Sequence, residues 1–162
     1  MGSLLCLPGN DPGTEAWIGT LADALLPDAP REIVAWRHWS TALPPDPAFE
    51  AAALAGRTPD VVIAKSFGTL VAARACSDGR LAPGRLLLLG VPADSLGADD
   101  VARLGALARS KGCLFVQQRD DVTGRASTLR ALLPAGAELL EVSGSDHRYA
   151  TDEIQPVLDG WP

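Results

Sequence analysis

Short, uninterrupted apolar runs alternate with longer segments of helical spacing along the whole chain. The stretches "LLCLP" (4–8), "VVIA" (61–64) and "RLLLLGV" (85–91) are apolar at almost every position. In "TEAWIGTLADALL" (14–26), by contrast, the apolar residues recur at helical intervals. Strands that are apolar on both faces are typical of a parallel sheet covered by helices on both sides. The pattern therefore predicts an α/β fold, a three-layer doubly wound sandwich.

The predicted elements cover the chain from end to end. Strands are expected at 4–8, 32–36, 61–64, 85–91, 113–117 and 137–142. Helices are expected at 14–26 with Thr14 as a cap, and at 48–55, 67–76, 99–110, 125–133 and 151–158, although Pro156 disfavours the last. No internal repeat or low-complexity segment divides the sequence, so residues 1–162 are expected to form a single domain.

The net charge and the spacing of the cysteines indicate which partners, metals and cellular compartment to expect. The formal net charge is −6, without a basic cluster, so nucleic acid and an anionic membrane are not expected partners. The N-terminal "MGSLLCLPGND" lacks the basic start and long apolar core of a signal peptide. The cysteines Cys6, Cys76 and Cys113 are far apart, and no spacing typical of zinc occurs. A cytoplasmic protein without a metal or other cofactor is the expectation.

Polar residues follow the strands at their carboxyl ends, where doubly wound folds bind ligands. Gly9–Asp11 follows the first predicted strand, and Ser66 follows the third. The segment 118–121 follows the fifth predicted strand, and 143–147 follows the sixth. A serine, an acid and a histidine, in that chain order, therefore fall on one edge of the sheet.

Ser66 has two interpretations, because it lies between a strand pattern and a helix pattern. A serine there is either the N-cap of the helix or a nucleophile. A nucleophilic serine needs a base within hydrogen-bond reach, and His147 is the plausible one. The other histidine, His38, lies between Trp36 and Trp39 and is expected to be a packing residue.

Four loops together resemble the α/β-hydrolase superfamily, in particular its small members without a lid. "AKSFGT" resembles the nucleophile elbow G-x-S-x-G, "LLCLPGND" the oxyanion loop, "VQQRDDVTG" the acid loop and "VSGSDHRY" the histidine loop. The resemblance runs from Leu4 to about Leu158, with Ala64 replacing the first glycine of the elbow and Pro8 a common histidine. It implies a minimal fold with strand order 2-1-3-4-5-6, since the family's first two strands are absent.

The resemblance also implies roles for individual residues. Ser66 is the expected nucleophile and His147 the base, with Asp121 as the preferred acid and Asp120 as the alternative. The backbone N–H groups of Phe67 and Asn10 are the expected oxyanion donors. Lys65, directly before the serine, is expected to be solvated at the surface, with contact to a neighbouring loop or a place over the mouth of the site as the alternatives.

The expected activity is that of a serine hydrolase, an esterase or thioesterase acting on a small ester, thioester or activated amide through an acyl-enzyme. Three alternatives stay open: acyl transfer, a non-hydrolytic step such as a cyclisation, and a hydrolase-like protein that only binds a small molecule or a partner. The segment 92–98 is too short for a helical cap, so an open cleft is expected, with 36–39, 44–47 and 92–96 as walls. Monomer and homodimer are equally compatible with the sequence.

Overall fold

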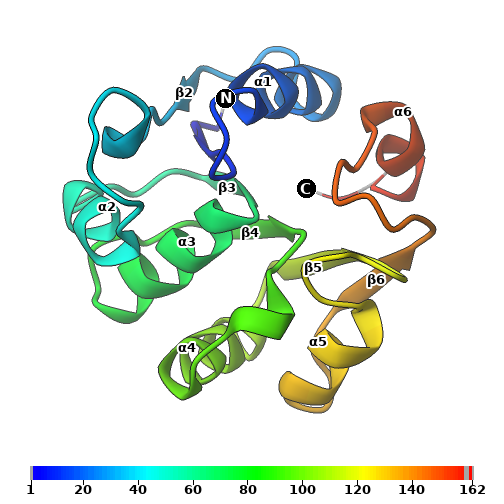
Figure 1. Ribbon diagram of the computed structural model, residues 1–162. Coiled ribbons are helices and arrows are strands. Elements are labelled where there is room, and N and C mark those ends of the chain that lie inside the picture. The colour runs from blue at the N-terminus through cyan, green and yellow to red at the C-terminus, as the bar shows by residue number, and fades with distance from the viewer. Residues whose placement is uncertain (1, 159–160, 162) are drawn as a thin grey trace.

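A six-stranded parallel sheet forms the centre of the computed structural model, which describes residues 2–158 and 161 (Figure 1). The strand order is β2-β1-β3-β4-β5-β6, and every neighbouring pair is parallel. The order predicted from the sequence is thus confirmed. The strands are β1 (Leu4–Leu7), β2 (Arg31–Ile33), β3 (Val61–Lys65), β4 (Arg85–Leu89), β5 (Cys113–Gln118) and β6 (Leu139–Val142).

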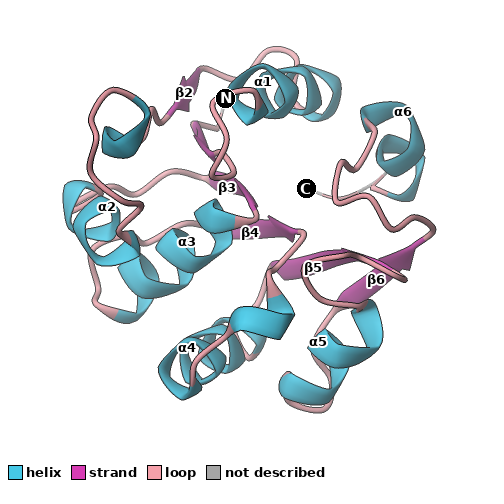
Figure 2. Cartoon of the chain, viewed as in Figure 1, coloured by secondary structure: helices cyan, strands magenta, loops and turns pink. Residues whose placement is uncertain are grey.

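Helices cover both faces of this sheet (Figure 2). They are α1 (Thr14–Leu25), α2 (Pro47–Ala53), α3 (Phe67–Ser77), α4 (Ala98–Ala108), α5 (Ala126–Leu132) and α6 (Thr151–Ile154). Three short 3-10 helices supplement them: η1 (Arg37–Trp39), η2 (Ala93–Ser95) and η3 (Gln155–Val157). In Figure 1, α1 and α6 lie on one side of the sheet and α2 to α5 on the other.

The continuous apolar runs fill two separate cores. Within β1, Leu5 and Leu7 pack beneath α2 to α5, whereas Leu4 and Cys6 pack beneath α1 and α6. Successive side chains of a strand point to opposite faces, so a strand with a helical layer on each side needs apolar residues at every position. This requirement explains the runs seen in the sequence.

Several element boundaries differ from the sequence prediction, among them those of β2, α1 and the last predicted helix. The second strand is Arg31–Ile33 and not 32–36, since Trp36 leaves the sheet and hydrogen-bonds through its indole to the loop after β1. Thr14 is the first residue of α1, and Gly13 is the cap; the Thr14 hydroxyl donates to the Asp11 carbonyl. The α-helix expected over 151–158 ends at Ile154 and continues as η3, which contains Pro156.

Across residues 2–158 and 161, the helices are all too short or too polar to cross a lipid bilayer.

Candidate active site

Ser66 lies at the turn between β3 and α3, in a backbone conformation that is rare for serine. Its φ is 49° and its ψ −114°, and its side chain makes no capping hydrogen bond to α3. A conformation of this kind costs on the order of 1–3 kcal/mol and persists only where the surrounding structure imposes it. The interpretation of Ser66 as a hydrogen-bonding helix cap is therefore wrong.

Tight packing of the backbone imposes this turn. A Cβ atom added to Gly68, near the start of α3, would lie 2.1 Å from the Leu7 carbonyl oxygen of β1. Ala64, in β3, is fully buried. A Cβ on Gly9 would lie 3.6 Å from the Ser66 Cβ, so the loop after β1 runs directly beside the serine. Small residues at these positions let strand, turn and helix approach one another.

The structure brings His147 together with Asp121 and not with Asp120. The Nδ1 atom of His147 lies 2.9 Å from Oδ1 and 2.8 Å from Oδ2 of Asp121, whose carboxylate is fully buried. Asp120 is exposed and lies 3.8 Å from the Arg125 guanidinium. Of the two candidate acids, Asp121 is the one in contact with the histidine.

Further donors surround the Asp121 carboxylate. Thr123 donates to it from its backbone N–H and its hydroxyl, both at 2.8 Å, and the Tyr149 hydroxyl donates at 2.7 Å. Burial favours the neutral acid, but the hydrogen bonds from His147, Thr123 and Tyr149 outweigh it and lower the pKa of Asp121 to about 2. The carboxylate is consequently ionised across the neutral range.

The contacts of His147 fix which of its ring nitrogens carries the proton. A carboxylate only accepts, so Nδ1 donates to Asp121, and in the neutral ring Nε2 keeps its lone pair. The backbone has φ 62° at His147, and its N–H donates to Gln118 Oε1 at 2.8 Å. Among the described residues, Nε2 is buried and has no hydrogen-bond partner, the Ser66 hydroxyl included.

Ser66 and His147 line the same cavity, which has a volume of about 640 Å³. Its other walls come from the loop after β1, from α1, from the end of β3 and from the histidine loop: Gly9, Asn10, Asp11, Gly13, Thr14, Trp17, Lys65, Asp146 and Arg148. The segments 36–39, 44–47 and 92–96 do not contribute to this lining. The walls expected from the sequence are thus wrong, and α1 and the histidine loop form walls of this cavity instead.

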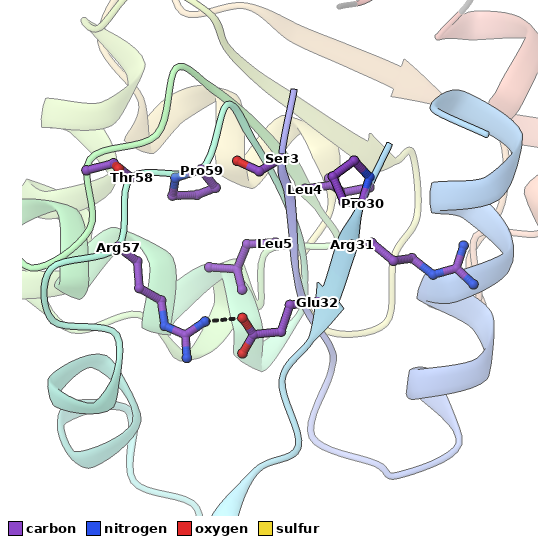
Figure 3. A pocket seen from close by; sticks show the side chains of 9 residues that line it. All are labelled: Ser3, Leu4, Leu5, Pro30, Arg31, Glu32, Arg57, Thr58 and Pro59. Carbon is purple, nitrogen blue, oxygen red and sulfur yellow. Dashed lines mark hydrogen bonds and ion pairs between the residues drawn. The ribbon is translucent and has the colours of Figure 1, made fainter. Parts of the chain in front are cut away.

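A second cavity, of about 430 Å³, opens at the opposite edge of the sheet, beside the first residues of β1 and β2 (Figure 3). An ion pair between Arg57 and Glu32 spans it. Of the residues that the structure describes, no histidine lines this second cavity, in contrast to the cavity at the carboxyl edge, which Ser66 and His147 share.

Lys65 is buried and not solvated, which corrects the expectation from the sequence. Its side chain is 3% exposed, and Nζ donates to the His147 carbonyl at 2.7 Å. Nζ also lies over the ring of Tyr149, 4.9 Å from its centroid. Burial lowers the pKa of Lys65 to about 8, while the charges of Asp121 and Asp146 oppose that shift. The amine therefore ties β3 to the histidine loop.

The two expected oxyanion donors flank the serine. Phe67 is the first residue of α3, and Asn10 lines the cavity. Within residues 2–158 and 161, neither backbone N–H has a hydrogen-bond acceptor. Both N–H groups are therefore unpaired in this part of the chain.

Sequence reasoning missed the residues that support the acid and the histidine. Gln118, Thr123 and Tyr149 each bond directly to Asp121 or His147. The sequence places Tyr149 two residues after His147, which does not reveal its hydrogen bond to Asp121.

The described residues contain no cluster of three or more histidine, cysteine, aspartate or glutamate side chains arranged to hold a metal ion. Comparisons with protein-family models, curated proteins and solved structures found no match to this chain.

Proposed function

We propose that this protein is a serine hydrolase, a small member of the α/β-hydrolase superfamily without a lid. The observation that carries the proposal is the cavity shared by Ser66, in its strained turn, and by His147, which is hydrogen-bonded to the buried Asp121. The strand order 2-1-3-4-5-6 supports it, as this order remains when the first two strands of the family's sheet are removed.

In the proposed reaction, Ser66 Oγ attacks the carbonyl carbon of an ester, thioester or activated amide. His147 Nε2 accepts the hydroxyl proton, and Asp121 stabilises the imidazolium that forms. The N–H groups of Phe67 and Asn10 bind the oxyanion of the tetrahedral intermediate. His147 then returns the proton to the leaving group, which departs and leaves an acyl-enzyme.

The same groups act in the second half of the reaction. Water attacks the acyl carbon and loses a proton to His147 Nε2, and the tetrahedral intermediate collapses to release the carboxylic acid. The proton passes back to Ser66 Oγ and regenerates the enzyme. An alcohol or thiol in place of water would convert the hydrolase into an acyltransferase.

One observation favours a competing proposal, that the protein only binds its ligand. No hydrogen bond joins Ser66 to the buried Nε2 of His147 within the described part of the chain. In resting hydrolases such bonds are often long and tighten when substrate binds, so the two proposals require an experiment.

The experiment is labelling with a fluorophosphonate probe, read by intact mass and peptide mapping. The hydrolase proposal predicts one adduct on Ser66, no adduct in Ser66→Ala, and slow labelling of His147→Ala. Ser145→Ala is the matched control, because Ser145 is exposed on the histidine loop and should not affect labelling. An unlabelled native protein would favour the binding proposal.

A second measurement separates hydrolysis from acyl transfer. Added alcohols or thiols would divert the acyl group into a new ester or thioester if transfer is the reaction. An unchanged yield of free acid would indicate hydrolysis.

A further inference from the structure

We infer that Trp36 is a positioning residue, which fixes the direction of the Asn10 N–H from behind the oxyanion loop. The inference rests on the proposed function, in which that N–H binds the oxyanion. Trp36 does not line the cavity, so it would act on catalysis only through the loop.

The indole of Trp36 holds two successive carbonyl groups of this loop. Its Nε1 atom lies 3.0 Å from the Gly9 oxygen and 3.2 Å from the Pro8 oxygen, and the side chain is 1% exposed. In a trans peptide the C=O and the following N–H point in opposite directions. A hydrogen bond that fixes the Gly9 carbonyl therefore also fixes the Asn10 N–H.

Two neighbouring side chains hold the next peptide along the loop. Trp39 Nε1 donates to the Asn10 oxygen at 2.8 Å, and His38 Nε2 lies 3.1 Å from the same oxygen. This carbonyl belongs to the peptide that carries the Asp11 N–H. The two tryptophans thus control different peptides, which gives the experiment a matched pair.

Trp36 also contacts the other expected donor segment. Its ring packs edge-on against Phe67, with centroids 5.4 Å apart and an interplanar angle of 81°. Phe67 follows Ser66 directly and begins α3. One buried side chain is therefore in contact with both segments whose N–H groups would meet at the oxyanion.

A purely structural role for Trp36 makes a different prediction. A buried indole N–H needs an acceptor, and any carbonyl would satisfy it. Under that role, removing the N–H would lower the stability of the fold without a selective loss in kcat.

The test compares Trp36→Phe with Trp39→Phe, using p-nitrophenyl acetate as substrate. Loss of a direct oxyanion donor lowers kcat by about 10²- to 10³-fold, so loosening one should lower it by about 10-fold or more. KM should stay within about twofold, since the donor acts in the transition state. Trp39→Phe should keep kcat within about threefold, because Asn10 N–H remains held by Trp36.

The backbone amide of Asn10 gives a readout that does not depend on activity. In ¹H–¹⁵N spectra its resonance should shift more in Trp36→Phe than in Trp39→Phe. Incorporating 3-benzothienylalanine at position 36 keeps the shape of the ring and replaces the N–H by sulfur. This variant should show the same loss of kcat if Trp36→Phe proves too unstable to purify.

Three results would overturn the inference: an Asn10 resonance that Trp36→Phe does not move, an equal loss of kcat in both tryptophan variants, or a benzothienyl variant with native kcat. A native protein that neither reacts with fluorophosphonate nor cleaves the ester would overturn the proposed function instead. The Asn10 resonance would then still decide whether Trp36 sets the orientation of the peptide.

Discussion

At the residue scale, the backbone of Ser66 is the feature that sets the site apart from an ordinary strand-to-helix turn. Serine is held at φ 49°, in a region where a Cβ atom is strained. A hydroxyl at such a turn projects from the end of the sheet toward whatever enters the cavity. Strained backbone conformations of this kind cluster at active sites and ligand-binding sites, where they lower the stability of the fold.

This strain predicts an order of stability for two variants. Ser66→Gly should be more stable than Ser66→Ala by about 1 kcal/mol, because relief of strain worth about 1–3 kcal/mol outweighs the roughly 0.5–1 kcal/mol entropy cost of glycine. Urea unfolding monitored by circular dichroism measures the difference. At Ser145, where φ is not positive, Ser145→Ala should instead be more stable than Ser145→Gly.

The environment of the two acidic residues predicts which one supports the histidine. Asp121→Asn should lower the rate of ester cleavage by about 10³- to 10⁴-fold, since an amide no longer holds His147 in the tautomer with a free Nε2. Asp120→Asn should stay within about threefold, because Asp120 is exposed and does not contact His147. Rates of p-nitrophenyl acetate cleavage provide the measurement, and the opposite result would reassign the acid.

At the scale of elements, the close approach of α3 to β1 shapes the turn. Gly68→Ala should lower the free energy of unfolding by about 3 kcal/mol, since its Cβ would overlap the rigid backbone at Leu7. Gly105→Ala in α4 is the matched control, because its Cβ would meet only side-chain atoms at 3.7 Å or more. That variant should gain about 0.5–1 kcal/mol from helix propensity. Equal effects in a urea titration would contradict this packing argument.

The elements also show how far the sequence alone could lead. The strands at 61–64, 85–91 and 113–117 were predictable within about two residues, because strands buried on both faces are apolar throughout. The end of β2 was not predictable, since Trp36 leaves the sheet for partners some 28 residues away in sequence. Local patterns carry no information about such distant acceptors.

Some residues of the candidate site were also predictable from the sequence, and others were not. Ser66, the acidic pair and His147 were predictable as residues at the carboxyl edge, since parallel strands end there together. The support from Tyr149 was not, because it requires positive φ values at both His147 and Tyr149. The burial of Lys65 likewise depends on a loop that returns from 82 residues further along the chain.

At the scale of the whole molecule, buried ionisable groups give stability a particular dependence on pH. The pKa of Lys65 is lowered from about 10.5 to about 8 by burial, so between these values the unfolded chain binds more protons than the native one. The free energy of unfolding should therefore rise with pH across this range, by roughly 3 kcal/mol from this group.

The buried thiols act in the opposite direction. Burial raises the pKa of Cys6 and Cys113 to about 12 and that of Cys76 to about 11, so above pH 9 the unfolded chain loses their protons first. The contribution of Lys65 consequently has to be measured as a difference between the native protein and Lys65→Met, both of which keep the thiols.

The free energy of unfolding of the native protein minus that of Lys65→Met should increase as the pH rises from about 8 to about 10. Urea titrations at several pH values measure it. Lys111→Met is the control, since it removes the same kind of side chain from an exposed position. A flat difference for Lys65→Met would mean that its amine is solvated in the native state.

Trp17 forms part of the cavity wall, and its indole N–H donates to the Tyr149 carbonyl at 2.8 Å. Indole fluorescence responds to the polarity of its surroundings, so a molecule that displaces solvent from this wall should alter the emission of Trp17. The share of Trp17 in the emission of the four tryptophans should therefore report occupancy of the cavity, so unlabelled compounds could be screened by fluorimetry.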